Sequence, residues 1–109
     1  MKLFLDDERF PPNDGADWQI VRTYQEACDW IDAHGIPSFI SFDHDLGDQS
    51  DESLDGYRFA WYLINVHMNQ ISRFPDDFDF YVHSQNPVGT ANIENLLKSF
   101  LGLVRKGER

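Results

Sequence analysis

The sequence contains little cysteine, little positive charge and no long hydrophobic run. Its single cysteine, Cys28, cannot form a disulfide within the chain, and no Cys-rich metal spacing is present. The 9 Lys and Arg residues are outnumbered by 19 Asp and Glu residues, and the net charge of −10 disfavours phosphate backbones and anionic membranes as partners. No stretch approaches the length of a membrane span and the N-terminal apolar run is too short for a signal peptide, so we expect a cytoplasmic protein.

The abundant residues indicate one folded domain. Hydrophobic residues make up 41% of the 109 positions and aromatic residues 15%, which is enough apolar surface for a single core. We therefore expect one domain over residues 1–109. The acidic excess does not exclude a phosphate substrate, because a bound divalent cation reverses the local charge of clustered carboxylates.

Short apolar runs alternate with helical periodicity and predict an α/β fold. Strands are expected over residues 2–5, 18–22, 38–42 and 78–82. Helices are expected to begin at Tyr24, Gly56 and Pro87, with Thr23 and Asn86 as caps. Strands that are joined by helices should be parallel, and right-handed crossovers place their carboxyl ends at one edge of the sheet.

Polar clusters begin where three of the predicted strands end. If strands 2–5, 38–42 and 78–82 are neighbours, their ends bring together Asp6-Asp7-Glu8-Arg9, Asp43-His44-Asp45 and His83-Ser84-Gln85-Asn86. Ligands of open α/β sheets bind outside this carboxyl edge. The coincidence of the three clusters is therefore the main functional signal in the sequence.

Four carboxylates in these clusters are candidate metal ligands. Asp6, Asp7, Asp43 and Asp45 carry hard oxygen donors. Two or three such oxygens with waters suit Mg²⁺ or Mn²⁺ better than zinc. Each Asp alone could equally be a solvated turn residue or a helix cap, so the prediction depends on the set.

Two histidines and three other polar residues are candidates for handling a substrate. His83 and His44 follow predicted strand ends directly and could give or take a proton. Ser84 and Asn86 precede a helix start, where free N–H groups favour an anion, although Asn86 could simply cap that helix. Arg9 suits a bidentate phosphate contact, with a salt bridge to a neighbouring Asp as the alternative.

The ordered motifs resemble those of a known family. The residues that carry the resemblance are Leu5-Asp6-Asp7-Glu8-Arg9, Phe42-Asp43-His44-Asp45-Leu46-Gly47, Asp55-Gly56-Tyr57 and His83-Ser84-Gln85-Asn86-Pro87-Val88-Gly89. They are similar to the cyclic-phosphate processing receiver domain family and, more distantly, to the phosphoacceptor receiver domain of two-component signalling. The resemblance implies a flavodoxin-like, receiver-like parallel sheet of about four strands with helices on both faces and the fifth α/β unit missing.

The resemblance also implies roles for individual residues. Asp6 and Asp7 would be an acidic pair that binds Mg²⁺, Asp43 would occupy the phosphoacceptor position, and Ser84 would stand where receivers carry a hydroxyl residue. The fifth strand of receivers, with its lysine, is absent from this sequence, which argues against a classical signalling switch. The additional histidines suit hydrolysis better.

These residues and the resemblance favour a metal-dependent phosphoesterase, a hydrolase that processes a cyclic phosphate on RNA or a nucleotide. His83, His44 and Asp43 would be catalytic, with Mg²⁺ or Mn²⁺ as the cofactor. The alternative is a non-catalytic receiver-fold module that binds a partner protein or a nucleotide, with the acidic residues 48–55 facing a basic partner. Phosphorylation of Asp43 is a third hypothesis.

Overall fold

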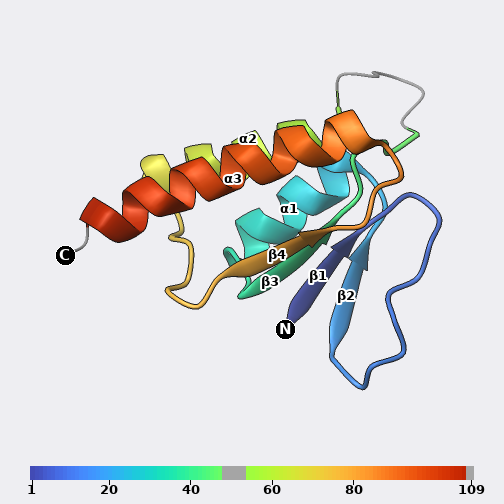
Figure 1. Cartoon of the computed structure of the whole chain (residues 1–109). Helices are drawn as coiled ribbons and strands as arrows, with labels where there is room; N and C mark the ends of the chain where they lie inside the picture. The colour runs from blue at the N-terminus through green and yellow to red at the C-terminus, as the bar shows by residue number, and fades with distance from the viewer. Residues whose placement is uncertain (48–53, 108–109) are drawn as a thin grey trace.

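The computed structural model describes residues 1–47 and 54–107, and this part of the chain forms a parallel sheet with three helices (Figure 1). The strands are β1 (Lys2–Leu5), β2 (Trp18–Val21), β3 (Phe39–Phe42) and β4 (Asp79–Val82), and the helices are α1 (Tyr24–His34), α2 (Gly56–Met68) and α3 (Pro87–Gly107). The predicted order of elements is confirmed, as is the receiver-like α/β class. Residues 48–53 of the predicted acidic segment lie outside the described residues.

The helix starts follow from their capping residues. The Thr23 hydroxyl accepts a hydrogen bond from the Glu26 backbone N–H at 3.0 Å, as predicted for the start of α1. The Asn86 side chain accepts from the Gly89 N–H at 3.0 Å at the start of α3. None of the helices in the described part of the chain has the length and hydropathy that a membrane crossing requires.

The sheet has the strand order β2-β1-β3-β4, and every neighbouring pair is parallel. The last residues of three strands are in register, because Leu5 pairs with Phe42 and Phe42 pairs with Val82. The next residues of these strands are Asp6, Asp43 and His83. The register therefore brings the three predicted polar clusters side by side at the carboxyl edge.

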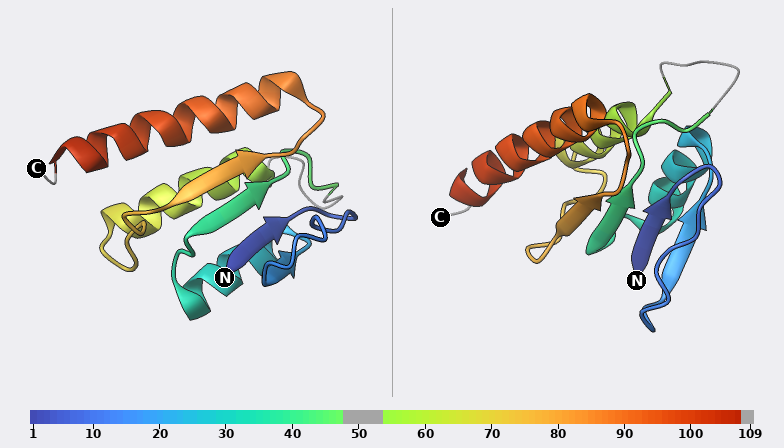
Figure 2. Two further views of the ribbon diagram at one scale, coloured as in Figure 1. Left: turned by 60° about the horizontal axis from the view of Figure 1, so that its bottom comes forward. Right: turned by 45° about the vertical axis from the view of Figure 1, so that its right-hand side comes forward.

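All three helices lie on one face of the sheet, so the expectation of helices on both faces is wrong (Figures 1 and 2). Helix α1 packs against α2, and α2 packs against α3. The crossovers from β2 to β3 and from β3 to β4 run in the same direction across the sheet. Right-handed crossovers that run the same way place their helices on the same face. The connection that runs the other way, from β1 to β2, contains no helix.

The core lies between the helices and one row of strand side chains. Leu3, Leu5, Ile40 and Phe42 from the central strands belong to the core cluster, together with residues from all three helices. The alternate side chains of the same strands point to the opposite face, since successive strand residues alternate between faces. That face has no covering helix among the described residues.

Candidate functional site at the carboxyl edge of the sheet

Asp6, Asp43 and His83 form a cluster at the ends of β1, β3 and β4. Each residue offers one possible ligand atom, and these atoms lie within 4.8 Å of one another. Asp6 is fully buried, Asp43 is 8% exposed and the His83 side chain is 13% exposed. The cluster offers both carboxylate and imidazole atoms, which are the kinds of ligand that metal ions use. Strand register produces this arrangement, because each residue follows a paired strand end.

Asp6 is held by hydrogen bonds to both of its carboxylate oxygens. Its Oδ1 accepts from the Glu8 and Arg9 backbone N–H groups at 2.9 Å each, and its Oδ2 lies 2.9 Å from His83 Nε2. Burial alone would raise the pKa of Asp6, but the N–H groups of Arg9 and Glu8 and the His83 ring outweigh it and hold that pKa below its usual value. Asp6 is therefore an ionised group that shapes the loop after β1.

Asp43 has the opposite electrostatic character. Burial raises the pKa of the Asp43 carboxyl, and the negative charges of Asp6 and Asp7 raise it further against the opposing effects of His83 and Arg9. No hydrogen bond from another described residue reaches this carboxylate. An ionised, buried Asp43 is thus incompletely compensated, and a cation beside it would remove the repulsion.

His83 is fixed on three sides. The Nε2 atom of His83 faces the ionised Asp6, so this nitrogen carries the proton of the neutral ring. The other ring nitrogen, Nδ1, then accepts a hydrogen bond from the Ser41 hydroxyl at 2.7 Å. The ring also stacks on Phe4, with 4.6 Å between ring centroids and 2° between the planes. Both nitrogens are therefore paired within the protein.

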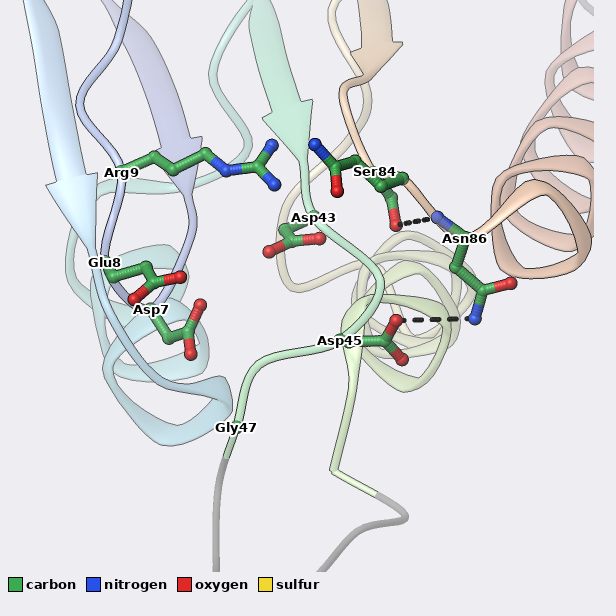
Figure 3. Close-up of a pocket in the computed structure, with 9 residues that line it drawn as sticks. Asp7, Glu8, Arg9, Asp43, Asp45, Gly47, Ser84 and Asn86 are labelled. Atoms are coloured by element: carbon green, nitrogen blue, oxygen red, sulfur yellow. Dashed lines mark hydrogen bonds between the residues drawn. The ribbon is translucent and has the colours of Figure 1, made fainter.

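A polar pocket of about 390 Å³ opens beside this cluster (Figure 3). Four carboxylates line it, from Asp7, Glu8, Asp43 and Asp45, and the guanidinium of Arg9 faces them. The remaining lining residues are Gly47, Ser84, Gln85 and Asn86. The pocket combines donors for a hard cation with groups that can bind an anion.

The turn after β3 brings its backbone close to Asp7. Gly47 has a φ of 61°, a conformation that favours glycine. A Cβ atom at Gly47 would lie 2.5 Å from Asp7 Oδ2. Glycine at this position therefore lets the β3 turn and the Asp7 carboxylate approach each other at the pocket.

Ser84 and Asn86 lie in the pocket and also organise the start of α3. The Ser84 hydroxyl accepts from the Asn86 backbone N–H at 3.1 Å, which leaves the hydroxyl proton to donate elsewhere. The Asn86 amide lies 3.4 Å from the Asp45 carboxylate while its carbonyl caps the helix (Figure 3). The predicted cap is confirmed, and the predicted anion contacts stay a prediction.

Like Asp6 and His83, His44 is not among the residues that line this pocket. Its Nδ1 lies 2.9 Å from Asp45 Oδ1, and its Nε2 lies 3.5 Å from Asp55 Oδ2. Its ring packs against the first turn of α3, where a Cβ atom at Gly89 would lie 2.4 Å from the ring. These contacts join the turn after β3 to the starts of α2 and α3. A catalytic role for His44 stays a prediction, and its surroundings favour a structural one.

Sequence reasoning missed four residues of the site. Glu8 and Gln85 lie inside the predicted polar clusters, but the sequence predicted no function for either of them. Gly47, the third, is the last residue of the motif that follows β3. Ser41 is the fourth, and its only sequence signal is a polar residue in an apolar strand, two positions before Asp43. Because strand residues two apart share a face, that spacing could have placed Ser41 beneath the site.

Comparison with known proteins identifies the family and supports the fold. The family model for the cyclic-phosphate processing receiver domain matches residues 1–99. No match was found among curated proteins. A solved structure described as the yeast Spc42 trimeric coiled coil fused to another structure is similar at a TM-score of 0.56 and 18% identity, over 97% of this chain and 81% of that chain. This last similarity supports the fold alone.

Proposed function

Because the chain belongs to the cyclic-phosphate processing receiver domain family, we propose that it is a metal-dependent phosphoesterase that hydrolyses a cyclic phosphate at the carboxyl edge of its sheet. The observation that carries the proposal is the composition of the edge pocket. Four carboxylates there face one guanidinium, and Asp43, the most buried of the four, lines the pocket although only 8% of the residue is exposed. Such a pocket has an excess of negative charge that a divalent cation would neutralise.

Asp43 and Asp7 are the residues best placed to hold Mg²⁺ or Mn²⁺, with Asp45 and the buried Asp6 beside them. The donor set fits, because both ions prefer carboxylate oxygens and water. A bound cation would neutralise the phosphate and polarise its phosphorus for attack. The approach of Gly47 to Asp7 keeps that carboxylate at the pocket wall.

The substrate phosphate is assigned to Arg9, Ser84 and Asn86. The Arg9 guanidinium lies over the pocket and makes two long contacts, 3.4 Å to the His83 carbonyl oxygen and 4.0 Å from its Nε to Asp6 Oδ2. The second is the salt bridge that the sequence offered as the alternative role, and both contacts are long enough to leave donors for an anion. The Ser84 hydroxyl proton and the Asn86 amide supply further donors on the opposite side of Asp43 (Figure 3). These groups would hold a cyclic phosphate between the two loops.

The reaction adds one water to the phosphorus and breaks one ring P–O bond. The attacking water loses a proton, the ribose oxygen that leaves gains one, and the product is a monoester. His83 lies beside the pocket, outside its lining. It would give the Nε2 proton that faces Asp6 to the leaving ribose oxygen, and the same nitrogen would then take up the proton lost by the water. Arg9 stabilises the charge that develops on the phosphate oxygens.

The test is hydrolysis of 2′,3′-cyclic AMP followed by ³¹P NMR, with Mn²⁺ and with EDTA. We expect a phosphomonoester with Mn²⁺, none with EDTA, and loss of turnover in Asp43→Asn. Asp77→Asn makes the same charge change at an exposed turn before β4, at the other end of the sheet, and should leave turnover intact. Turnover that persists in EDTA, or its absence with any cyclic phosphate, would reject the proposal.

A second candidate is a receiver-fold module that binds a nucleotide or a partner protein without catalysis. The specific observation in its favour is that both His83 nitrogens are already paired, with Ser41 and Asp6. Saturable binding of 2′,3′-cyclic AMP with no product after prolonged incubation would select this candidate over the phosphoesterase.

A further inference from the structure

The face of the sheet opposite the helices carries an aromatic pocket. It has a volume of about 240 Å³, and aromatic side chains from all four strands line it, namely Phe4, Trp18, Phe39 and Tyr81. Tyr81 is 62% exposed, although it stands in a sheet strand. Phe4 is 4% exposed, and Trp18 and Phe39 are partly buried. All-parallel sheets usually have both faces covered, so the exposed Tyr81 ring on this face requires an explanation.

The rings of this aromatic pocket are held in place by neighbouring groups. The Trp18 indole N–H donates to the Asp14 carboxylate at 3.0 Å, which fixes the orientation of the ring. Trp18 stands edge-on to Phe4 and to Phe39, at interplanar angles of 85° and 81°. The pocket is thus ordered before any ligand binds, which lowers the entropic cost of binding.

His83 connects the aromatic pocket to the acidic edge. Its ring lines the pocket and stacks on Phe4, while its Nε2 reaches Asp6 in the cluster at the strand ends. Phe4 lies in β1 and Asp6 directly follows that strand, so the two residues are about 6.6 Å apart along the extended chain. The acidic pocket and the aromatic pocket share no lining residue. A ligand that occupies both would place an anionic group at the edge and reach past His83 with a flat ring.

We propose that the aromatic pocket binds the nucleobase of a cyclic nucleotide whose phosphate lies at the acidic edge. This inference rests on the proposed function for the identity of the phosphate group. Its own support is the gathering of four aromatic side chains around one pocket on the open face of the sheet, since aromatic side chains on a sheet face bind bases by stacking in RNA-recognition domains.

The size and charge of the pocket favour a single base over a macromolecule. Its volume lies below the range of about 300–1,000 Å³ that is typical of sites for drug-sized ligands, which suits one heterocycle. The net charge of −10 opposes a long polyanion but has little effect on a neutral base. Lys2 also lines the aromatic pocket and adds a positive charge to it. Its Nζ lies 5.0 Å from the Phe39 ring centroid, at the end of β1 away from Asp6.

The experiment uses the Trp18 indole N–H as a local reporter in ¹H–¹⁵N NMR spectra, identified by its loss in Trp18→Phe. Titration with adenosine, which has no phosphate, should shift this signal, and inorganic phosphate should not. Phe39→Ala should weaken binding of 2′,3′-cyclic AMP about tenfold, which corresponds to about 1.4 kcal/mol and lies in the usual range for base stacking. The Mn²⁺ affinity of Phe39→Ala should equal that of the wild type.

Two further variants make the result decisive. Tyr81→Ala changes an exposed side chain, so it should weaken nucleotide binding without unfolding the domain. Phe10→Ala removes a ring that is 76% exposed and lies outside the pocket, and it should bind like the wild type.

The inference is overturned if millimolar adenosine leaves the Trp18 signal unmoved, or if Phe39→Ala and Tyr81→Ala bind 2′,3′-cyclic AMP normally. A dimer in sedimentation that Tyr81→Ala dissociates would also overturn it, because a second copy would then cover the face. Failure of the proposed function has a different signature. Adenosine and the two variants would behave as expected, while Mn²⁺ binding or turnover would be absent.

Discussion

The Nε2 atom of His83 lies 2.9 Å from the Oδ2 atom of Asp6, and this contact joins the end of β4 to the end of β1 across the intervening strand β3. The contact keeps the His83 ring beside Asp43 and on the same face of the sheet as the aromatic pocket. One histidine thus belongs to two neighbouring sites. Its orientation is the feature on which the geometry of both depends.

Ser41 should control that orientation. In Ser41→Ala the Nδ1 atom of His83 loses its 2.7 Å partner in a buried setting, and such a loss destabilises proteins by about 1–3 kcal/mol. We expect a free energy of unfolding lower by about that amount in urea titrations. Ser99→Ala removes an exposed hydroxyl on α3 and should change it by less than about 0.5 kcal/mol. Equal stability of the two variants would show that Ser41 does not support His83.

Asp43→Asn should make the metal-free protein more stable at neutral pH. Burial and the charges of Asp6 and Asp7 raise the pKa of Asp43 in the folded state above its unfolded value of 3.8. A group of this kind favours folding when protonated, and that contribution is lost as the pH rises through its folded pKa. At pH 7 the ionised Asp43 is therefore a cost to the folded state, and Asn removes it.

Thermal unfolding at pH 7 in EDTA measures this effect. Asp43→Asn should have a higher Tm than the wild type, and the gap should narrow as the pH falls toward 4. Adding Mn²⁺ should raise the Tm of the wild type and leave that of Asp43→Asn nearly unchanged, since ligands stabilise only the form that binds them. A lower Tm for Asp43→Asn in EDTA would contradict the electrostatic account. Asp77→Asn again provides the control with the same charge change.

The order of strands and helices could be predicted from the sequence because the local signals agree with one another. Thr23 and Asn86 mark helix starts, and apolar runs end at Leu5, Phe42 and Val82, where the observed strands also end. The meeting of the strand ends followed from parallel topology, on the condition that strands 2–5, 38–42 and 78–82 are neighbours, and the observed strand order meets that condition. The family resemblance rested on the same residues and is supported by the family match.

Two features were not predictable in the same way. The placement of all helices on one face depends on the strand order β2-β1-β3-β4, which local periodicity does not specify. The separation of His44 from His83 depends on side-chain direction, because His44 turns toward Gly89 and Asp55 while His83 turns toward Asp6. His83 is the first residue after β4, whereas His44 is the second after β3. The alternation of side chains along a strand is the signal that separates them.

Cys28 should be unreactive in the folded protein. It is 4% exposed, and burial raises the pKa of its thiol to about 11, so the reactive thiolate is scarce at pH 8. A thiol reagent such as dithionitrobenzoate should therefore label it at pH 8 only at the rate at which the domain opens. Addition of urea above the unfolding midpoint should make labelling immediate. Rapid labelling without urea would show that α1 is not packed as described.

Gly89 and Gly102 provide a matched pair on α3. A Cβ atom at Gly89 would lie 2.4 Å from the His44 ring, whereas one at Gly102 would have no described atom within 4 Å. Gly89→Ala should therefore destabilise the domain by about 1–3 kcal/mol through overpacking. Gly102→Ala should stabilise it by about 0.5–1 kcal/mol, because alanine loses less backbone entropy in a helix. Chemical denaturation of both variants measures the difference.

The cause of the Gly89→Ala effect can be isolated with His44→Ala. If the new methyl group collides with the imidazole, the double variant His44→Ala with Gly89→Ala should lose less stability than the two single changes added together. Residues in contact show such non-additivity, by about 0.5–3 kcal/mol. Additive losses would mean that the His44 ring moves aside freely, and His44 would then be available for the catalytic role predicted from the sequence. Non-additive losses would establish His44 as the packed link between the β3 turn and the start of α3.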